Sequence, residues 1–521
     1  SVAIDEGARR ALAGSAGHVD ALVRLARDAD PEVRAPAVMA LGKREAVAPS
    51  LLVAALADGD WRVRVEAVRA LAQPRLAAEQ RAALAAHLAR EWALAITEGM
   101  RTPRMHVVLE GLSALAGAGG EKLVAEMAAG LEKSAAGRLA RTGDSAQALA
   151  AGAVHCLAVA IRVRAGGEIE DLLACGGPPE RGWPAHLRRA LAAETAAAAG
   201  AALPADNPRR RHLETQVQTL TMDGDPRVRA AALSAAVELA KGAADLEPLE
   251  RRLRAGIGDR SIEVSGTAAD AVAELATGGE GASPEAAEAA RRRWAPLVDL
   301  VGERAAAGVD GDIEVRLTYL GALAKARAGR EVCVLAHGDP AAPVRRAARD
   351  CLKAIDGVDS GPGTARAAAP PPPYRPDGNQ AKVRWQLSTS KGLIEIDLDP
   401  QRAPWHVAAI IGLTRSGLYD GRLWHRVAAG FVVQGGSPYD SSWGGPDFIL
   451  PGEPTPGEYR HGTVGIADSG MDTGGSQFFI MHGRAPHLDG RYTIVGEVVT
   501  GQSVADALIV GDTILHASVI E

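Results

Sequence analysis

The stretch LWHRVAAGFVVQGG, residues 423–436, consists of short apolar runs that glycine interrupts. Similar runs, separated by glycine and proline, continue from there to the end of the chain. Upstream, residues 383–398 alternate between apolar and polar around a Ser-Lys-Gly turn, and residues 404–416 have a helical pattern that begins at a proline. Many short strands joined by tight turns favour a closed antiparallel barrel. We therefore expect a β-barrel in the C-terminal part of the chain.

Three blocks of this C-terminal part carry a family resemblance. The stretch at 423–436 resembles the F-H-R-x-x-x-G-F-x-x-Q-G-G block of cyclophilins. GSQFFI at 475–480 matches their second block, and LDGRYTIVG at 488–496 is similar to their L-D-G-x-[HY]-x-x-F-G block. The blocks follow the order and the separations of the family. The resemblance implies a peptidyl-prolyl cis–trans isomerase on an eight-stranded antiparallel β-barrel with two capping helices, with no metal and no cofactor.

The resemblance also implies which residues form the site. Arg426 matches the catalytic arginine of the family, whose guanidinium can donate to the prolyl nitrogen, or hold the neighbouring carbonyl, as the bond twists. Gln434 and Gln477 match the polar partners that orient this arginine and bind the substrate backbone. Ala467 and Asp468 match the backbone that pairs with residues before proline. The substrate-binding residues that the resemblance implies are Phe431, Val432, Gln434, Ala467, Asp468, Gln477, Phe479, His487, Leu488 and Tyr492.

Several of these residues also have an ordinary structural interpretation. Arg426 would then be a stacked surface residue, and Gln434 a buried structural amide. Phe431 and Phe479 would belong to the core instead of the wall that receives a proline ring. His425 adjoins the arginine on the opposite face of a strand, so a structural role is favoured for it.

Five positions depart from the commonest family pattern. Trp424 stands where the family usually has Phe, Val432 where many members carry Met, Asp468 where Asn is common, and Tyr492 where many have His. The exchange at residue 432 is a modest loss of pocket-lining volume. The exchange at 468 should be tolerated because the role of this residue lies in its main chain, and the exchange at 492 is common enough in the family to keep the pocket competent. His487 occupies the position of a Trp in the members most sensitive to cyclosporin. We therefore expect weakened binding of this inhibitor with catalysis largely retained.

Residues 356–381 separate two parts of different composition. They contain four consecutive prolines at 370–373, which favour an extended polyproline conformation without internal hydrogen bonds. The segment is therefore expected to be a semi-rigid spacer that leaves the two parts partly independent. A ligand for a polyproline-binding partner domain is the alternative interpretation.

Residues 1–355 repeat one short signature: DPEVR at 30–34, DWRVR at 60–64 and DPRVR at 225–229, with looser copies at 312–316 and 339–345. The aspartate can cap a helix by accepting a hydrogen bond from free backbone N–H groups, and proline suits the first helical position. The valine begins an apolar stripe at helical spacing. The signature, followed by an Ala- and Leu-rich helix, resembles HEAT repeats. It implies an all-α solenoid, since a single helical hairpin cannot bury its own apolar face.

A solenoid usually binds a partner, so we expect a protein partner on its concave face. Nucleic acid is not an expected partner, because the chain carries a net charge of -6. The arginine clusters at 209–211 and 291–293 are accordingly interpreted as solvated surface. Since no run of about 18 apolar residues occurs, a membrane span is not expected.

The four cysteines form two spaced pairs, Cys156 with Cys175 and Cys333 with Cys351. Without a CxxC motif, a zinc or redox site is not expected. Buried free thiols are the preferred interpretation, and one or two helix-to-helix disulfides are the alternative. The paired cysteines and the absence of an initiator Met before Ser1 lean toward a bacterial periplasm or envelope, with the cytoplasm left open.

The sequence thus predicts a multidomain protein: a HEAT-like α-solenoid over 1–355, a Pro- and Gly-rich linker over 356–381, and a cyclophilin-like isomerase domain over 382–521. It would isomerise X–Pro bonds of protein substrates, assisting folding or conformational switching. The solenoid would hold a client or partner near the enzyme, whose local concentration the linker raises. The alternative is a non-catalytic scaffold that binds proline-containing segments, although a pure binder would have no need of Arg426.

Overall fold

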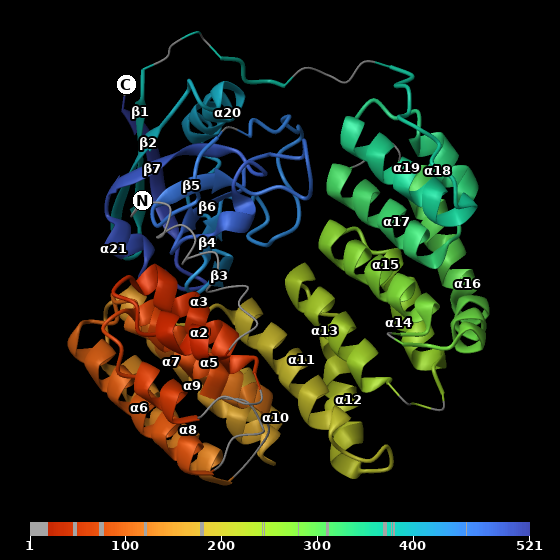
Figure 1. The fold of residues 1–521 in the computed structure, drawn as a ribbon. Coiled ribbons are helices and arrows are strands. Elements are labelled where there is room, and N and C mark those ends of the chain that lie inside the picture. The colour runs from red at the N-terminus through yellow and green to blue at the C-terminus, as the bar shows by residue number, and fades with distance from the viewer. Residues whose placement is uncertain are drawn as a thin grey trace.

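The chain folds into a curved array of helices and a β-barrel (Figure 1). The computed structural model describes residues 19–44, 49–71, 78–118, 122–177, 182–241, 243, 245–279, 281–308, 312–367, 372–376, 378, 381–454 and 456–520. The helices of the array are α2 (Val19–Leu25), α3 (Pro31–Gly42), α4 (Pro49–Ala55), α5 (Trp61–Leu71), α6 (Ala78–Thr97), α7 (Arg104–Ala118), α8 (Lys122–Arg141), α9 (Ser145–Arg164), α10 (Ile169–Ala174), α11 (Ala185–Ala201), α12 (Pro208–Leu220), α13 (Pro226–Leu239), α14 (Glu247–Ile257), α15 (Ile262–Thr277), α16 (Pro284–Ala307), α17 (Ile313–Ala326), α18 (Arg330–Ala336) and α19 (Ala342–Asp356). The predicted solenoid is therefore confirmed.

The repeated signature starts helices as predicted. Asp30 and Asp225 accept hydrogen bonds from backbone N–H groups two residues ahead, at 2.9 and 3.0 Å, and a proline follows each of them. The signature's last arginine links neighbouring repeats: Arg229 donates to the carbonyls of the preceding loop and pairs with Asp259 of the next repeat at 2.9 Å. Arg34 pairs with Asp58 in the same way, at 2.8 Å. The signature therefore fixes both the helix start and the stacking of the units.

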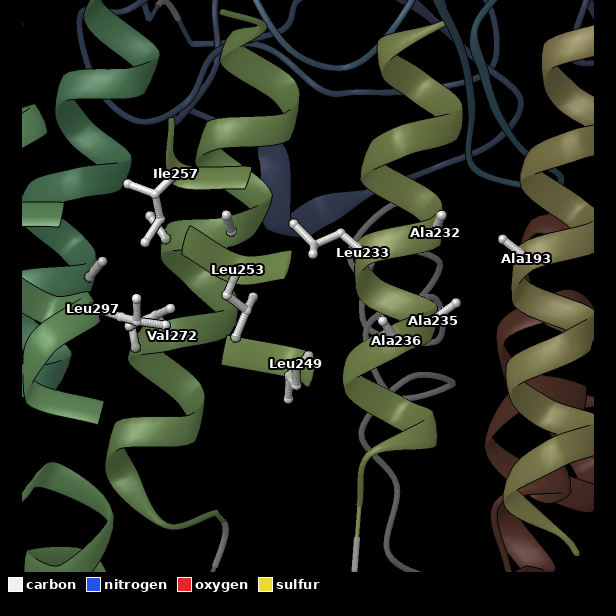
Figure 2. Close-up of a cluster of buried hydrophobic side chains, with 14 of the residues drawn as sticks. Ala193, Ala232, Leu233, Ala235, Ala236, Leu249, Leu253, Ile257, Val272 and Leu297 are labelled. Carbon is white, nitrogen blue, oxygen red and sulfur yellow. The ribbon is translucent and has the colours of Figure 1, made fainter. Parts of the chain in front are cut away.

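The solenoid core consists mainly of small and branched apolar side chains. The predicted stripe on α13 is buried, and Figure 2 shows its alanines between α11 and α14. Alanine contributes little area but lets helices approach closely, so the core is built by stacking rather than by large side chains. Helix α9 is the one described helix that is long and apolar enough to cross a membrane. Because 83% of its most apolar window is buried, it is explained as a core helix.

Both cysteine pairs are disulfides, so the preferred interpretation as free thiols was wrong. Cys156 of α9 is bonded to Cys175, directly after α10, and Cys333 of α18 is bonded to Cys351 of α19. The paired residues are 19 and 18 positions apart, on successive helices of one hairpin. Helix packing brings their Cα atoms to 5.3 and 6.1 Å, within the range that a disulfide spans.

The C-terminal part is the predicted eight-stranded antiparallel barrel. Its strands, in the spatial order β3-β4-β6-β5-β7-β2-β1-β8, are β1 (Val383–Thr389), β2 (Gly392–Leu398), β3 (Arg426–Ala428), β4 (Val432–Gly435), β5 (Thr463–Ile466), β6 (Phe478–Met481), β7 (Ile494–Thr500) and β8 (Ile514–Ile520). A bridge between Leu423 and Thr513 joins the segments that precede the two edge strands. The helices are α20 (Pro404–Arg415), α21 (Gln502–Ala505) and the 3₁₀ turn η1 (Pro486–Leu488). The aromatic rings of Trp385, Tyr419, Trp424 and Phe478 lie within its core.

The linker does not keep the two parts separate. At α5 and α7, Arg62 donates to the carbonyl of His482 at 3.2 Å, and His106 donates to the carbonyl of Asp506 at 2.8 Å. The ring of Trp61 lies edge-on against His482, with centroids 5.3 Å apart. The apolar cluster of the first repeats also includes Ala429 and Ile509 of the barrel.

Contacts continue in the middle and at the other end of the solenoid. The side chain of Arg227 on α13 lies 3.5 Å from the carbonyl oxygen of Asp440, and Arg346 on α19 pairs with Asp472 at 3.0 Å. The expected partial independence is therefore not what the structure shows: polar and apolar contacts hold the barrel along the inner side of the curved array (Figure 1).

Candidate functional site

Three of the predicted site residues lie in one row across three strands. In the antiparallel register, Arg426 of β3 is opposite Gln434 of β4, and Gln434 is opposite Phe479 of β6. Opposite residues of an antiparallel pair project from the same face, so the row places an arginine, an amide and an aromatic ring side by side. Gly430, with a φ of 82°, allows the tight turn that sets this register.

A chain of hydrogen bonds orients the arginine. Arg426 Nη1 donates to Gln434 Oε1 at 2.9 Å, and Gln434 Nε2 donates to Gln477 Oε1 at 2.9 Å. Gln477 Nε2 in turn donates to the carbonyl of Gly444 at 2.8 Å. The two amides are buried while the arginine is exposed. The guanidinium therefore has one edge fixed by buried groups while it faces solvent.

A second apolar cluster, separate from the barrel core, lies beside this row. Val432, Phe479 and Leu488 are buried in it, and Phe431, Ala467 and Tyr492 pack against it half-buried. His487 is exposed and stacks on Phe431 with ring centroids 5.6 Å apart. The structure thus brings the predicted apolar residues together next to the row that contains the arginine.

Ala467 and Asp468 follow β5 on the other side of the row. The N–H of Ala467 donates to the carbonyl of Gln477 at 3.0 Å, which fixes this segment against β6. Asp468 Oδ1 accepts from the N–H of Gly470 at 3.1 Å, so its side chain serves its own turn. Burial raises the pKa of Asp468 to about 6.

Other residues of the site were not predicted from the sequence. Tyr459 is fully buried and stacks on Phe479 with centroids 5.7 Å apart, and Met481 fills the same apolar cluster. Gly444 supplies the carbonyl that ends the amide chain. Glu314, on the solenoid, reaches the loop of Gly444. The only signal for Tyr459 is an aromatic residue ahead of a short apolar run, and the only signal for Glu314 is its place in the looser copy of the repeated signature at 312–316.

The titratable groups near the arginine do not form an acid–base pair. Burial lowers the pKa of His425 to about 4, so its imidazole is neutral near pH 7. Within the described part of the chain, no group of three or more His, Cys, Asp or Glu side chains is placed to hold a metal ion. The described groups place an oriented cation beside an apolar cluster.

Comparisons with known proteins agree with this geometry. Residues 384–518 match the family described as cyclophilin type peptidyl-prolyl cis-trans isomerase/CLD, and residues 19–98 match HEAT repeats. The chain is 40% identical over 132 residues to a peptidyl-prolyl cis-trans isomerase of Helicobacter pylori, a match that covers 25% of this chain and 82% of that protein. It is 41% identical over 140 residues to peptidyl-prolyl cis-trans isomerase B of Bacillus subtilis, covering 26% and 98%. A solved cyclophilin-type isomerase of Cryptosporidium parvum is 24% identical, with a TM-score of 0.25, over 27% of this chain and 98% of that one.

Proposed function

The chain belongs to the family of cyclophilin-type peptidyl-prolyl cis–trans isomerases, and we propose that Arg426 is its catalytic residue. The observation that carries this proposal is the chain of hydrogen bonds from Arg426 through Gln434 and Gln477, beside an apolar cluster. A cation held in this way can act on a peptide bond without a nucleophile or a proton relay.

The chemistry follows from the electronic structure of the peptide bond. Resonance gives its C–N bond partial double-bond character, and the barrier to rotation is about 18–20 kcal/mol. As the bond twists, the lone pair returns to the proline nitrogen. A guanidinium N–H that donates to this nitrogen, or that holds the neighbouring carbonyl, stabilises the twisted state more than the planar ones. Arg426 needs no reorganisation for this, because Gln434 already orients it.

The substrate groove in this proposal has two sides. The wall of Phe431, Phe479 and Leu488 receives the proline ring, and Val432, His487 and Tyr492 complete this side. The backbone at Ala467 and Asp468, together with Gln434 and Gln477, binds the residues that precede proline. Bringing the ring into an apolar pocket fixes one side of the bond, so that rotation moves only the preceding carbonyl.

We further propose that the substrates are X–Pro bonds of protein chains, and that the enzyme assists folding or conformational switching. Uncatalysed isomerisation takes tens to hundreds of seconds, slow enough to limit folding. In this proposal residues 1–355 are the scaffold, 356–381 the linker and 382–521 the enzyme. The surface of the scaffold that remains outside its contacts with the barrel would bind a partner. The two disulfides support an oxidising compartment such as a periplasm.

The test is the cis-to-trans rate of a short X–Pro peptide with the full chain, Arg426→Ala and Arg384→Ala. Arg384 lies on β1 and pairs with Asp397 at 2.6 Å, away from the row. We expect acceleration by the full chain and by Arg384→Ala, and a loss of about 10²–10³-fold in Arg426→Ala, the effect of removing one transition-state donor. Equal rates for the two variants would overturn the role of Arg426. Peptide binding without acceleration by the full chain would favour the scaffold alternative.

A further inference from the structure

A carboxylate of the solenoid holds two loops of the isomerase. Glu314 is the second residue of α17, two positions after its N-cap Asp312. One of its carboxylate oxygens accepts a hydrogen bond from the backbone N–H of Gly444. The other accepts from the hydroxyl of Ser469 at 2.9 Å. One side chain therefore joins the loop after β4 to the loop after β5.

Both loops carry parts of the proposed substrate groove. The carbonyl of Gly444 accepts from Gln477, the last amide of the chain that orients the arginine. Ser469 directly follows the segment expected to pair with residues that precede proline. A cavity of about 50 Å³ lies between the loops and is lined by Glu314 together with Gln434, Gln477, Ala467 and Asp468. The solenoid is thus part of the wall of the groove.

A second helix of the solenoid holds the same loop. Arg346 of α19 pairs with Asp472 at 3.0 Å and donates to the carbonyl of Met471. Asp472 Oδ1 also accepts from the N–H of Gly452 at 2.9 Å. The loop after β5 is therefore fixed from two repeats and from the barrel itself.

Glu314 is packed against the barrel loops, which contribute both to its burial and to its hydrogen bonding. Burial raises its pKa, and the nearby charge of Asp312 raises it further. The N–H of Gly444 and the hydroxyl of Ser469 act in the opposite direction and lower the pKa of Glu314. These two donors offset part of the cost of burying the carboxylate, which in return joins the two loops.

We infer that the solenoid completes the substrate groove, and that Glu314 is a positioning residue for the recognition of substrate residues on the N-terminal side of the target proline. The inference rests on the proposed function, since it assumes that the groove beside Arg426 binds substrate. Glu314 does not act on the rotating bond. It sets the spacing of the two loops between which the preceding residues of the substrate lie.

The experiment compares two substrates in the full chain: a blocked X–Pro dipeptide, and a peptide with four residues before the proline. We expect Glu314→Ala to lower kcat/KM for the longer peptide about tenfold, equivalent to about 1.4 kcal/mol, through a higher KM, and to lower it much less for the dipeptide, which has no residues to place between the two loops. Glu314→Gln should retain most of the activity, because its amide oxygen can accept from Gly444 and its NH₂ can donate to Ser469. Glu303→Ala, an exposed carboxylate on α16, is the matched control and should change neither rate.

Ser469→Ala provides a second variant that leaves the solenoid intact. It should reproduce part of the selective loss for the longer peptide, and adding it to Glu314→Ala should lower the rate little further, since Glu314→Ala already lacks the hydrogen bond to Ser469. An equal loss for both peptides in Glu314→Ala, or no loss in either, would overturn the inference. The proposed function fails separately, because it predicts that Arg426→Ala slows both substrates alike.

Discussion

The contact between Gly266 and Trp443 tests whether the barrel is docked on the solenoid as described. Gly266 is buried within α15, and Trp443 lies in the loop after β4. A Cβ atom added at residue 266 would lie 2.5 Å from Cζ3 of Trp443, and closer still to Cη2. The substitution Gly266→Ala therefore cannot be accommodated without moving the indole ring or the loop that carries it.

The magnitude follows from two opposing effects. Alanine stabilises a helix by about 1 kcal/mol relative to glycine, but this gain is present whether or not the loop is docked. The overlap with the indole exists only in the docked state and costs about 1–3 kcal/mol, the range for overpacking. The free energy of opening the loop should fall by this amount, and the Gly444 amide, which donates to Glu314, should exchange roughly 5- to 150-fold faster.

The assay is amide hydrogen exchange of residues 440–448 in a double-mutant cycle. In a Trp443→Ala background the overlap is gone, so adding Gly266→Ala should leave the exchange rate unchanged, giving a coupling of about 1–3 kcal/mol. Gly321→Ala on α17 is the matched control, because nothing lies within 4 Å of its added Cβ, and it should show no coupling. Equal effects of Gly266→Ala in both backgrounds would refute the docked arrangement.

Three further predictions follow from particular contacts. Burial lowers the pKa of His106 far below its ordinary value and that of His482 to about 4, so the undocked state takes up protons first as the pH falls below about 6.5. Docking should therefore be fully stable above this pH and weaken towards pH 4, which faster proteolysis of the linker would report. Equal cleavage at pH 7 and pH 5 would contradict this prediction. Replacing His487 by Trp should tighten cyclosporin binding in a calorimetric titration, with peptide turnover nearly unchanged, and unaltered affinity would remove residue 487 as the cause. The double variant Cys156→Ser, Cys175→Ser should be less stable by about 2–4 kcal/mol in denaturant unfolding of the oxidised protein, whereas an unchanged midpoint would mean that this disulfide is not formed.

The sequence predicted those features of the fold that depend on neighbours along the chain. An aspartate followed by proline starts a helix through local contacts, because its side chain accepts a hydrogen bond from the backbone two residues ahead. Helices α3 and α13 therefore begin where the signature places them. Alternation around a short turn likewise predicts the hairpin of β1 and β2. The family resemblance implied Arg426, Gln434 and Phe479 as site residues, and the register places them side by side, an arrangement that was not predicted.

Features that depend on contacts between distant segments could not be predicted in this way. The cysteine pairs are compatible with free thiols or disulfides until the packing of their helices fixes the distance between them. The prolines at 370–373 favour an extended conformation, but a stiff spacer does not determine whether the parts that it joins have complementary surfaces. Glu314 looks like an ordinary first-turn acidic residue of α17, stabilised by the helix dipole, and only the docked barrel reveals its second role.

The repeated signature nevertheless contains information about docking, in its variable position. This position is Arg62 in α5, Arg227 in α13 and Glu314 in α17, each two residues after the capping aspartate. Because stacked repeats place equivalent residues along one edge, these side chains form a row that faces the barrel. The two arginines lie against backbone carbonyls, those of His482 and Asp440, whereas the glutamate meets a backbone N–H. At these three repeats the sign of the charge thus matches the backbone group opposite it, so the variable residue of the signature contributes to how the enzyme is seated.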